Sequence, residues 1–284
     1  MIFTHEITHP ELLKEWLKRH QFSKKTVSAI KQNGALIING QPVTVRKMLC
    51  PQDILQIHLP KEQPSSNLQP YNKQLDICYE DPYVLVVRKY QQQNCTPSRE
   101  HPHYSLIEQV LSYCRNKGED INPHIVTRLD RDTEGLVIFA KYGHIHHLFS
   151  TVTLQKTYIA LVNGQTDSSG VIEANIKRSP NSIITREVAQ EGKYAKTSYK
   201  TLAHNHHYSI CQIHLHTGRT HQIRVHFKHI GHPIVGDDLY GGTHPTIQGQ
   251  TLQCSGILFD HPIEKKQISI TIDYKQILKL FRNI

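Results

Sequence analysis

A short polar segment, Arg128-Leu129-Asp130-Arg131-Asp132-Thr133-Glu134-Gly135, stands directly before the apolar run Leu136–Ala140. The apolar run predicts a buried strand, which would hold a carboxylate of the preceding loop rigidly at the edge of a cleft. Arg128 and Arg131 flank Asp130, so a phosphate-bearing ligand could be held close to an acidic group. Asp130 is therefore a candidate catalytic residue. Taken alone, the segment is explained equally well as a surface turn with exposed ion pairs.

Two further segments carry candidate functional residues. The predicted strand Lys156–Gly164 places Tyr158 among aliphatic residues, where an aromatic ring either packs in the core or stacks on an unpaired base. The segment Thr217–His226 combines a glycine, two arginines and a helix start capped by Thr220. Helix amino termini and guanidinium groups both favour phosphate or carboxylate, so this segment predicts an anion site.

The elements that must position these segments follow one another as strands, without regular crossover helices. Ser105 and Glu108 form a capping box ahead of a helix at 106–117, and a second helix follows Thr220. Strands are predicted at 75–80, 83–88, 136–140, 157–162, 171–177, 197–202, 208–216, 256–259 and 267–272. We therefore expect an α+β fold at residues 74–284, with a mixed, mostly antiparallel sheet and flanking helices.

The first sixty residues predict a separate small α+β domain. Pro10 opens an amphipathic helix, Ser23 caps a second one, and a hairpin with the turn Asn39-Gly40 precedes a strand at 53–59. This order resembles the alpha-L-type RNA-binding domain, and Lys24 and Lys25 at the start of the second helix are the candidate RNA contacts. Residues 61–73, rich in proline, serine and amides, predict a linker between domains 1–60 and 74–284.

The composition indicates a polyanionic partner and a reducing compartment. The 284 residues include 33 Lys and Arg against 24 Asp and Glu, which gives a formal charge of +9. Basic surfaces attract phosphate backbones. Six scattered cysteines without a C-x-x-C pair, and a start without an apolar signal segment, predict a cytoplasmic protein with reduced thiols. No apolar run approaches the roughly 20 residues of a membrane-spanning helix.

The 21 histidines raise the question of a metal site. Clusters such as His204, His206 and His207 have no neighbouring cysteine or carboxylate of the kind that a closed metal site requires. We therefore expect no metal. Nothing in the sequence resembles a nucleotide-binding motif, so we expect no other cofactor either.

Taken together and in this order, the three polar segments resemble the RluA-type family of pseudouridine synthases. That family's core motif, His-Arg-Leu-Asp-x-x-Thr-Ser-Gly before a leucine-rich strand, corresponds to Thr127–Gly135. The strand Lys156-Thr157-Tyr158-x-Ala160 and the segment Gly218–His226 match the family's next two blocks. Softer matches extend the similarity from about Leu75 to Ile272, and an appended RNA-binding domain is common in the family.

The resemblance implies the pseudouridine synthase fold and the isomerisation of an RNA uridine that is flipped into a pocket. Asp130 would act as a nucleophile or would assist glycosidic cleavage, and Arg224 would favour its charged form. Tyr158 would stack on the uracil, Arg128 would fill the space left by the flipped base, and Arg219 would contact phosphate. The other motif positions expected to contact RNA are Thr133, Gly135, His221 and Gln222.

The resemblance favours ribosomal RNA as the partner, with tRNA as an alternative, and we expect a monomer. Three positions depart from the family pattern: Thr127 replaces a histidine, Glu134 a serine, and Tyr90 the proline that follows Lys89. Two other classes of function compete. A catalytically inactive RNA-binding or ribosome assembly protein would not need the aspartate, tyrosine and arginine together, and a metal-dependent nuclease would need clustered carboxylates or histidines.

Overall fold

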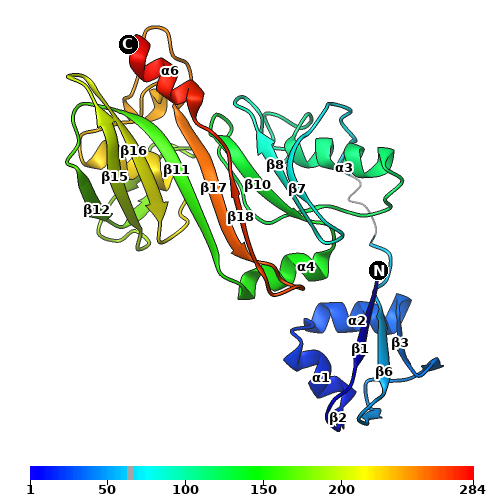
Figure 1. The fold of residues 1–284 in the computed structure, drawn as a ribbon. Coiled ribbons are helices and arrows are strands. Elements are labelled where there is room, and N and C mark those ends of the chain that lie inside the picture. The colour runs from blue at the N-terminus through cyan, green and yellow to red at the C-terminus, as the bar shows by residue number, and fades with distance from the viewer. Residues whose placement is uncertain (63–66) are drawn as a thin grey trace.

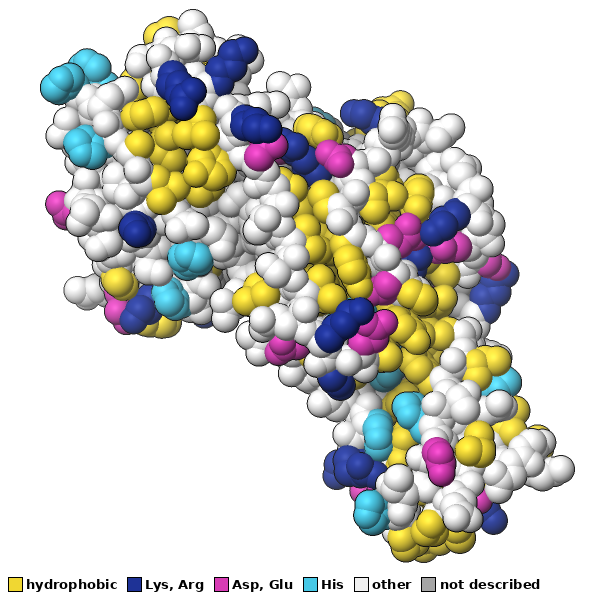
Figure 2. Space-filling view, viewed as in Figure 1, with side chains coloured by type: hydrophobic (Ala, Val, Ile, Leu, Met, Phe, Trp, Pro, Cys, Tyr) yellow, Lys and Arg dark blue, Asp and Glu magenta, His cyan; other side chains and the backbone are white. Residues whose placement is uncertain are grey.

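The computed structural model describes residues 1–62 and 67–284, which form two units. Figure 1 shows a small amino-terminal lobe and a larger α+β domain built on one long sheet. In Figure 2 the amino-terminal unit stands out as a lobe of its own, which joins the larger domain across a narrow contact. Within the described residues, no helix has the length and apolar character needed to cross a membrane.

The amino-terminal domain has a four-stranded antiparallel sheet in the order β1-β6-β3-β4. Its elements are β1 (Ile2–Glu6), β2 (Glu11–Leu12), α1 (Leu13–Arg19), α2 (Lys24–Asn33), β3 (Ala35–Ile38), β4 (Gln41–Pro42), β5 (Met48–Leu49) and β6 (Ile54–His58). The predicted cap of α2 is confirmed, because Ser23 Oγ accepts a hydrogen bond from Thr26 N at 3.0 Å. The turn Asn39-Gly40 is confirmed as well, with φ angles of 50° and 82° that suit these two residues.

Two features of this domain differ from the prediction. Strand β1 was not predicted, because its five residues bury only Phe3 and so give no clear alternation. Helix α1 begins at Leu13 rather than at Pro10, because Glu11 and Leu12 pair with β5 instead.

The larger domain is built on a ten-stranded sheet in the order β12-β15-β16-β11-β17-β10-β8-β7, with β18 paired to β17 and β9 to β10. The strands are β7 (Asp76–Glu80), β8 (Val84–Lys89), β9 (His124–Ile125), β10 (Glu134–Ala140), β11 (Leu154–Asn163), β12 (Ser169–Glu173), β15 (Lys196–His204), β16 (Tyr208–Leu215), β17 (Leu252–Asp260) and β18 (Gln267–Thr271). Only β10 and β17 pair in parallel in this sheet of the described chain. The expected α+β fold with a mixed, mostly antiparallel sheet is therefore confirmed.

Helices and a side hairpin surround this sheet. They are α3 (Leu106–Asn116), α4 (Gly143–Leu148), α5 (Gln222–His229), α6 (Lys275–Asn283), the short 3-10 turns η1 (Phe149–Thr151) and η2 (Asp238–Tyr240), and the pair β13 (Ile176–Arg178) and β14 (Arg186–Val188). The capping box of α3 is confirmed, since the backbone N–H and the hydroxyl of Ser105 both donate to Glu108. The strand predicted at 171–177 is divided, because the chain leaves the large sheet after Glu173.

The amino-terminal domain is docked on the larger one through aromatic rings. The ring of Phe22 stacks on that of His144 in α4 with a centroid distance of 4.2 Å. Phe3 meets His144 edge-on at 5.6 Å and stacks on Tyr83 at 6.4 Å. All of these rings except Tyr83 are buried, so the two domains share one continuous apolar cluster. Figure 1 shows α4 directly beside the amino-terminal lobe.

The expected linker at 61–73 lies in part outside the described residues, and its described ends are bound to the larger domain. Lys61 pairs with Asp120, and Glu62 accepts a hydrogen bond from Gly143 N at 2.6 Å, at the start of α4. On the other side of the gap, the backbone N–H groups of Gln69 and Tyr71 donate to Glu108.

We expect acid to weaken the docking contact. Burial lowers the pKa of His144 to about 4, from an ordinary value of 6.5. Between these two pH values the undocked state binds the proton more readily than the docked state, so docking becomes less favourable as the pH falls through this window. The loss between pH 7 and pH 5 is about 2 kcal/mol. Small-angle scattering should therefore give a larger radius of gyration at pH 5 than at pH 7.

Two variants separate this effect from other histidines. His144→Leu keeps an apolar side chain between Phe3 and Phe22 but cannot titrate, so its radius of gyration should change less than that of the wild type. His206→Gln changes an exposed histidine of the larger domain and should behave like the wild type. A wild-type radius of gyration that is equal at both pH values would contradict the expectation.

Candidate active site

The loop that carries Asp130 connects β9 to β10 and turns back on itself. The backbone N–H of Thr133 donates to the carbonyl of Asp130 at 3.1 Å, and β10 begins at Glu134. Gly135 has a φ of 121°, and a Cβ atom there would lie 2.2 Å from the carbonyl oxygen of Cys254. Only glycine therefore allows β10 to approach β17 this closely, and this approach fixes the point at which the loop ends.

The last residue of β8 and the segment that follows this strand hold the backbone on both sides of Asp130. Lys89 is fully buried, and its Nζ donates to the carbonyl of Arg131 at 2.7 Å and to those of Gln93 and Tyr90 at 2.8 and 3.0 Å. On the other side, the Cys95 thiol lies 3.3 Å from the N–H and 3.4 Å from the carbonyl of Leu129.

Burial lowers the pKa of Lys89 to about 8, so the ammonium group keeps its three donors at neutral pH. A single buried cation therefore joins the segment after β8 to the residue that follows Asp130.

A buried arginine connects Asp130 to a second carboxylate. Arg224 Nη1 donates to Asp130 Oδ2 at 3.2 Å, while its Nε and Nη2 donate to the two carboxylate oxygens of Asp237 at 2.7 and 2.8 Å. The side chains of Arg224 and Asp237 are 5% and 1% exposed, whereas that of Asp130 is 31% exposed. Burial acts to lower the pKa of Arg224, but the two carboxylates outweigh it and raise the pKa, so the guanidinium stays charged.

Helix α5 begins differently from the prediction. Thr220 is not the cap; the helix starts at Gln222, and the preceding His221 adopts the left-handed conformation with a φ of 57°. This conformation costs about 1–2 kcal/mol for a residue with a Cβ atom. The Gln222 side chain instead holds the loop before the helix, because its Oε1 accepts from the Thr217 hydroxyl at 2.8 Å and from Arg219 N at 2.9 Å.

The unusual backbone at His221 aims its ring at the site. His221 Nε2 lies 3.8 Å from Asp130 Oδ2, and Nδ1 lies 2.8 Å from the hydroxyl oxygen of Tyr240. The ring of Tyr240 also packs under the guanidinium of Arg224, with the carbon of that group 4.9 Å from the ring centroid. The carboxylate of Asp130 is therefore bordered by the guanidinium of Arg224 and the imidazole of His221, and Tyr240 contacts both of these groups.

Tyr158 lies in β11, where a register shift between Thr157 and Tyr158 interrupts the pairing with β17. Its side chain is 4% exposed. Burial raises the pKa of Tyr158 well above its ordinary value, and Cys254 and Asp130 add to the effect. The phenol is therefore uncharged, and it lies close enough to Asp130 to sense that carboxylate.

The structure thus places Asp130 against Arg224 and His221 of another motif, and the Asp130 charge acts on the pKa of Tyr158 in a third motif. Thr133, Gly135 and Gln222 are buried around them, and their contact with RNA stays a prediction. Arg128 and Arg219 are exposed; Arg219 Nε donates to the carbonyl of Tyr194 at 2.9 Å.

Lys24 and Lys25 do not join this cluster. They begin α2 in the amino-terminal domain, two and three residues after Phe22, whose ring stacks on His144. Since α4 follows the end of β10 and Asp130 precedes its start, these lysines and Asp130 lie at opposite ends of that strand.

The side chains at the three positions that depart from the family pattern form hydrogen bonds with neighbouring strands. Thr127 is buried, and its Oγ1 accepts from Ile138 N at 3.0 Å. Glu134 accepts from Arg88 Nε at 2.9 Å, and the Tyr90 hydroxyl donates to Asp76 at 2.8 Å. These three side chains bond to residues of β10, β8 and β7 rather than to Asp130, Arg224 or His221.

Sequence reasoning missed Asp237, Tyr240, Cys95 and the anchoring role of Lys89. A usable signal was present at two of them, because Lys89 ends a strand that begins with the wholly apolar run Val84–Val87, and Asp237 follows Ile234-Val235. A charged residue at the edge of a buried run needs a partner. Among the described residues, no group of three or more histidines, cysteines or carboxylates is placed to hold a metal ion.

Comparisons with known proteins agree with this geometry. Residues 83–229 match the model of a family described as RNA pseudouridylate synthase. The chain is 38% identical over 262 residues to the uncharacterized RNA pseudouridine synthase YjbO of Bacillus subtilis, covering 90% of this chain and 93% of that protein. It is 30% identical over 247 residues to ribosomal large subunit pseudouridine synthase D of Zymomonas mobilis, covering 80% and 78%.

Solved structures show the same fold at lower sequence identity. Human RNA pseudouridylate synthase domain containing 1 superposes with a TM-score of 0.59 and 21% identity, covering 76% of this chain and 98% of that one. The family match, the similarity along most of the chain, and the fold lead to one conclusion. The chain belongs to the RluA-type family of RNA pseudouridine synthases.

Proposed function

We propose that this protein converts uridine to pseudouridine in ribosomal RNA, with Asp130 as the catalytic carboxylate. Its family membership makes it an isomerase that acts on RNA uridine. The observation that supports the role of Asp130 is its contact with Arg224, a charged and buried arginine that holds the partly exposed carboxylate at the junction of three motifs. Ribosomal RNA is supported by a relative named for the ribosomal large subunit.

The reaction rearranges bonds within one nucleotide. The bond between C1′ of the ribose and N1 of uracil breaks, and a bond between C1′ and C5 forms. The proton on C5 leaves and N1 gains a proton, so atoms and electrons balance without a cofactor. An ionised carboxylate can attack the sugar or assist cleavage, and Arg224 donates a hydrogen bond to it.

Tyr158 supplies an uncharged aromatic ring beside the carboxylate. In its neutral form a phenol can pack against the uracil face and can also exchange a proton at its oxygen. We propose these roles for Tyr158, insertion beside the flipped base for Arg128, and phosphate contact for Arg219, which are both exposed.

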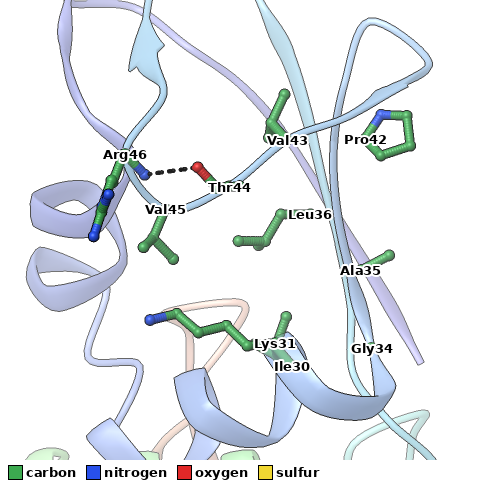
Figure 3. A pocket seen from close by; sticks show the side chains of 10 residues that line it. All are labelled: Ile30, Lys31, Gly34, Ala35, Leu36, Pro42, Val43, Thr44, Val45 and Arg46. Carbon is green, nitrogen blue, oxygen red and sulfur yellow. Dashed lines mark hydrogen bonds between the residues drawn. The ribbon is translucent and has the colours of Figure 1, made fainter.

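We propose residues 1–60 as an RNA-binding domain that is joined through 61–73 to the catalytic domain at 74–284. Figure 3 shows a groove on this domain whose floor is formed by Ile30, Leu36, Val43 and Val45, with Lys31 and Arg46 beside it. Together with the exposed Lys24 and Lys25 at the start of α2, these cations give the domain several contacts for a phosphate backbone. We propose a cytoplasmic location, which fits a ribosomal RNA substrate.

Asp130→Asn should abolish pseudouridine formation, because an amide is no longer an anionic nucleophile. Pseudouridine maps of total RNA from cells with the wild-type gene, a deletion and the Asp130→Asn gene should lose the same sites in both altered strains. Asp132→Asn makes the same change two residues away and should keep those sites. Sites that are lost in the deletion but kept with Asp130→Asn would exclude Asp130 as the catalytic residue.

Asp237→Asn should slow the reaction without changing any group that faces the substrate. An amide cannot accept both Arg224 bonds, and misplacement by about 1 Å can cost roughly 100-fold in rate. We expect a fall in kcat of about that size with a smaller change in KM, measured with purified protein on an RNA transcript. Asp238→Asn, at the exposed neighbouring position, is the matched control. Equal kcat values for the two variants would contradict this role for Asp237.

Lys89→Met should lower both stability and activity. The change leaves three carbonyl groups without their donor, at about 1–3 kcal/mol for each buried unsatisfied group, so we expect the free energy of unfolding to fall by about 3 kcal/mol or more. Urea unfolding measures this loss, and Lys200→Met on the surface of β15 is the control. A Lys89→Met protein as stable as the control would show that water replaces the ammonium group.

A further inference from the structure

The imidazole of His221 borders Asp130, and the resemblance predicts only an RNA contact for it, without a part in the chemistry. Its Nε2 is 3.8 Å from Asp130 Oδ2, and 12% of its side chain is exposed. A hydrogen-bonding nitrogen therefore lies beside the reactive carboxylate, at an edge that a substrate can reach. The protein keeps a left-handed backbone at this residue, with a φ of 57°, to place the ring there.

The hydroxyl of Tyr240 determines which nitrogen of His221 carries the proton. Tyr240 is 2% exposed, and among the described residues its hydroxyl bonds to two groups: Arg186 N at 2.9 Å and His221 Nδ1 at 2.8 Å. The Arg186 N–H can only donate. If Nδ1 also donated, the buried hydroxyl hydrogen would have no acceptor, so the hydroxyl donates to Nδ1. In the neutral ring the proton is then on Nε2, the nitrogen that faces Asp130.

The surroundings keep this ring neutral. Burial lowers the pKa of His221; Arg224 and Arg186 act in the same direction, while Asp130 and Asp237 oppose them. Tyr240, the fifth group that faces the ring, is itself uncharged because burial raises its pKa. The result is a donor that carries no net charge, so it adds a hydrogen bond to the site without neutralising Asp130.

We propose that His221 is a further catalytic residue, which donates its Nε2–H to a carbonyl oxygen of the uracil as the glycosidic bond breaks. This inference rests on the proposed function. When the C1′–N1 bond breaks, its electron pair stays on the base and is shared between N1 and the neighbouring carbonyl oxygen. A sugar carbon held at Asp130 brings that oxygen close to a donor 3.8 Å from the carboxylate. The proton stays on Nε2, so the bond stabilises charge without transferring a group.

The tautomer can be measured without RNA. In protein labelled with nitrogen-15 at histidine, two-bond proton–nitrogen spectra distinguish the Nε2–H ring, the Nδ1–H ring and the charged ring. The signals of His221 are those that disappear in His221→Gln. We expect the Nε2–H ring at pH 7 in the wild type, and a mixture of both neutral rings in Tyr240→Phe, which removes only the hydroxyl. A charged ring or an Nδ1–H ring in the wild type overturns the proposal.

Kinetics test the catalytic role on an RNA that the wild type modifies. His221→Ala should lower kcat by about 100- to 1,000-fold, as expected for one lost donor to a developing oxyanion, with a smaller change in KM. His221→Gln places an amide N–H near the position of Nε2 and should be faster than His221→Ala. His229→Ala, at an exposed position of the same helix, should keep the wild-type rate.

A double variant separates the two residues. Because Tyr240 acts through His221, Tyr240→Phe should slow the wild type but not the His221→Ala protein. Thermal melting identifies a variant that fails to fold. If His221→Ala is such a variant, the tautomer of His221 in the wild type and the kcat of the single variant Tyr240→Phe test the proposal instead. An active wild type with an equally active His221→Ala overturns the role of His221 alone. A wild type that modifies no RNA counts against the proposed function instead.

Discussion

A guanidinium group buried between two carboxylates sets the geometry of this active site. Arg224 must be charged and is almost fully enclosed, so its donors need partners, and Asp237 and Asp130 provide them. The bond to Asp237 is bidentate and buried, which fixes the arginine in position before any substrate arrives. Three pieces of chain must then meet at one point: α5 with Arg224, the residues before η2 with Asp237, and the loop before β10 with Asp130.

The residues that bring Asp130 to this point fix the backbone on either side of it and leave its side chain partly exposed. Gly135 lets β10 lie against β17 in parallel, and Lys89 and Cys95 fix the residues on either side of the aspartate. The backbone of Asp130 is therefore held on both sides, while its carboxylate contacts Arg224 and solvent. A similar arrangement is seen at α5, where the Gln222 side chain binds the backbone of the preceding loop and the ring of His221 faces the site.

Sequence patterns predicted the parts of the molecule that depend on local chemistry. The caps at Ser23 and Ser105, the Asn39-Gly40 turn and the mostly antiparallel sheet follow from residues close together in the chain, and they are confirmed. The pairing of Asp130 with Arg224 came from the family resemblance, and the two side chains do meet.

Contacts between distant residues were harder to predict. The predicted start of α5 was wrong, because the helix begins at Gln222 after a left-handed backbone at His221, and a left-handed histidine has no strong local signature. Lys89 and Asp237 were missed for a related reason: their partners are backbone carbonyls and a distant arginine. The assignment of Lys24, Lys25, Arg128 and Arg219 to RNA contact stays a prediction.

The docking of the amino-terminal domain has a consequence for how a target is chosen. Its lysines lie near α4, at the end of β10, and Asp130 lies before the start of that strand, which spans about 23 Å for seven residues. While the rings of Phe22 and His144 stay stacked, this separation is fixed. With the proposed RNA contacts at Lys24 and Lys25, a bound RNA would have to span this fixed separation between the lysines and the nucleotide at Asp130.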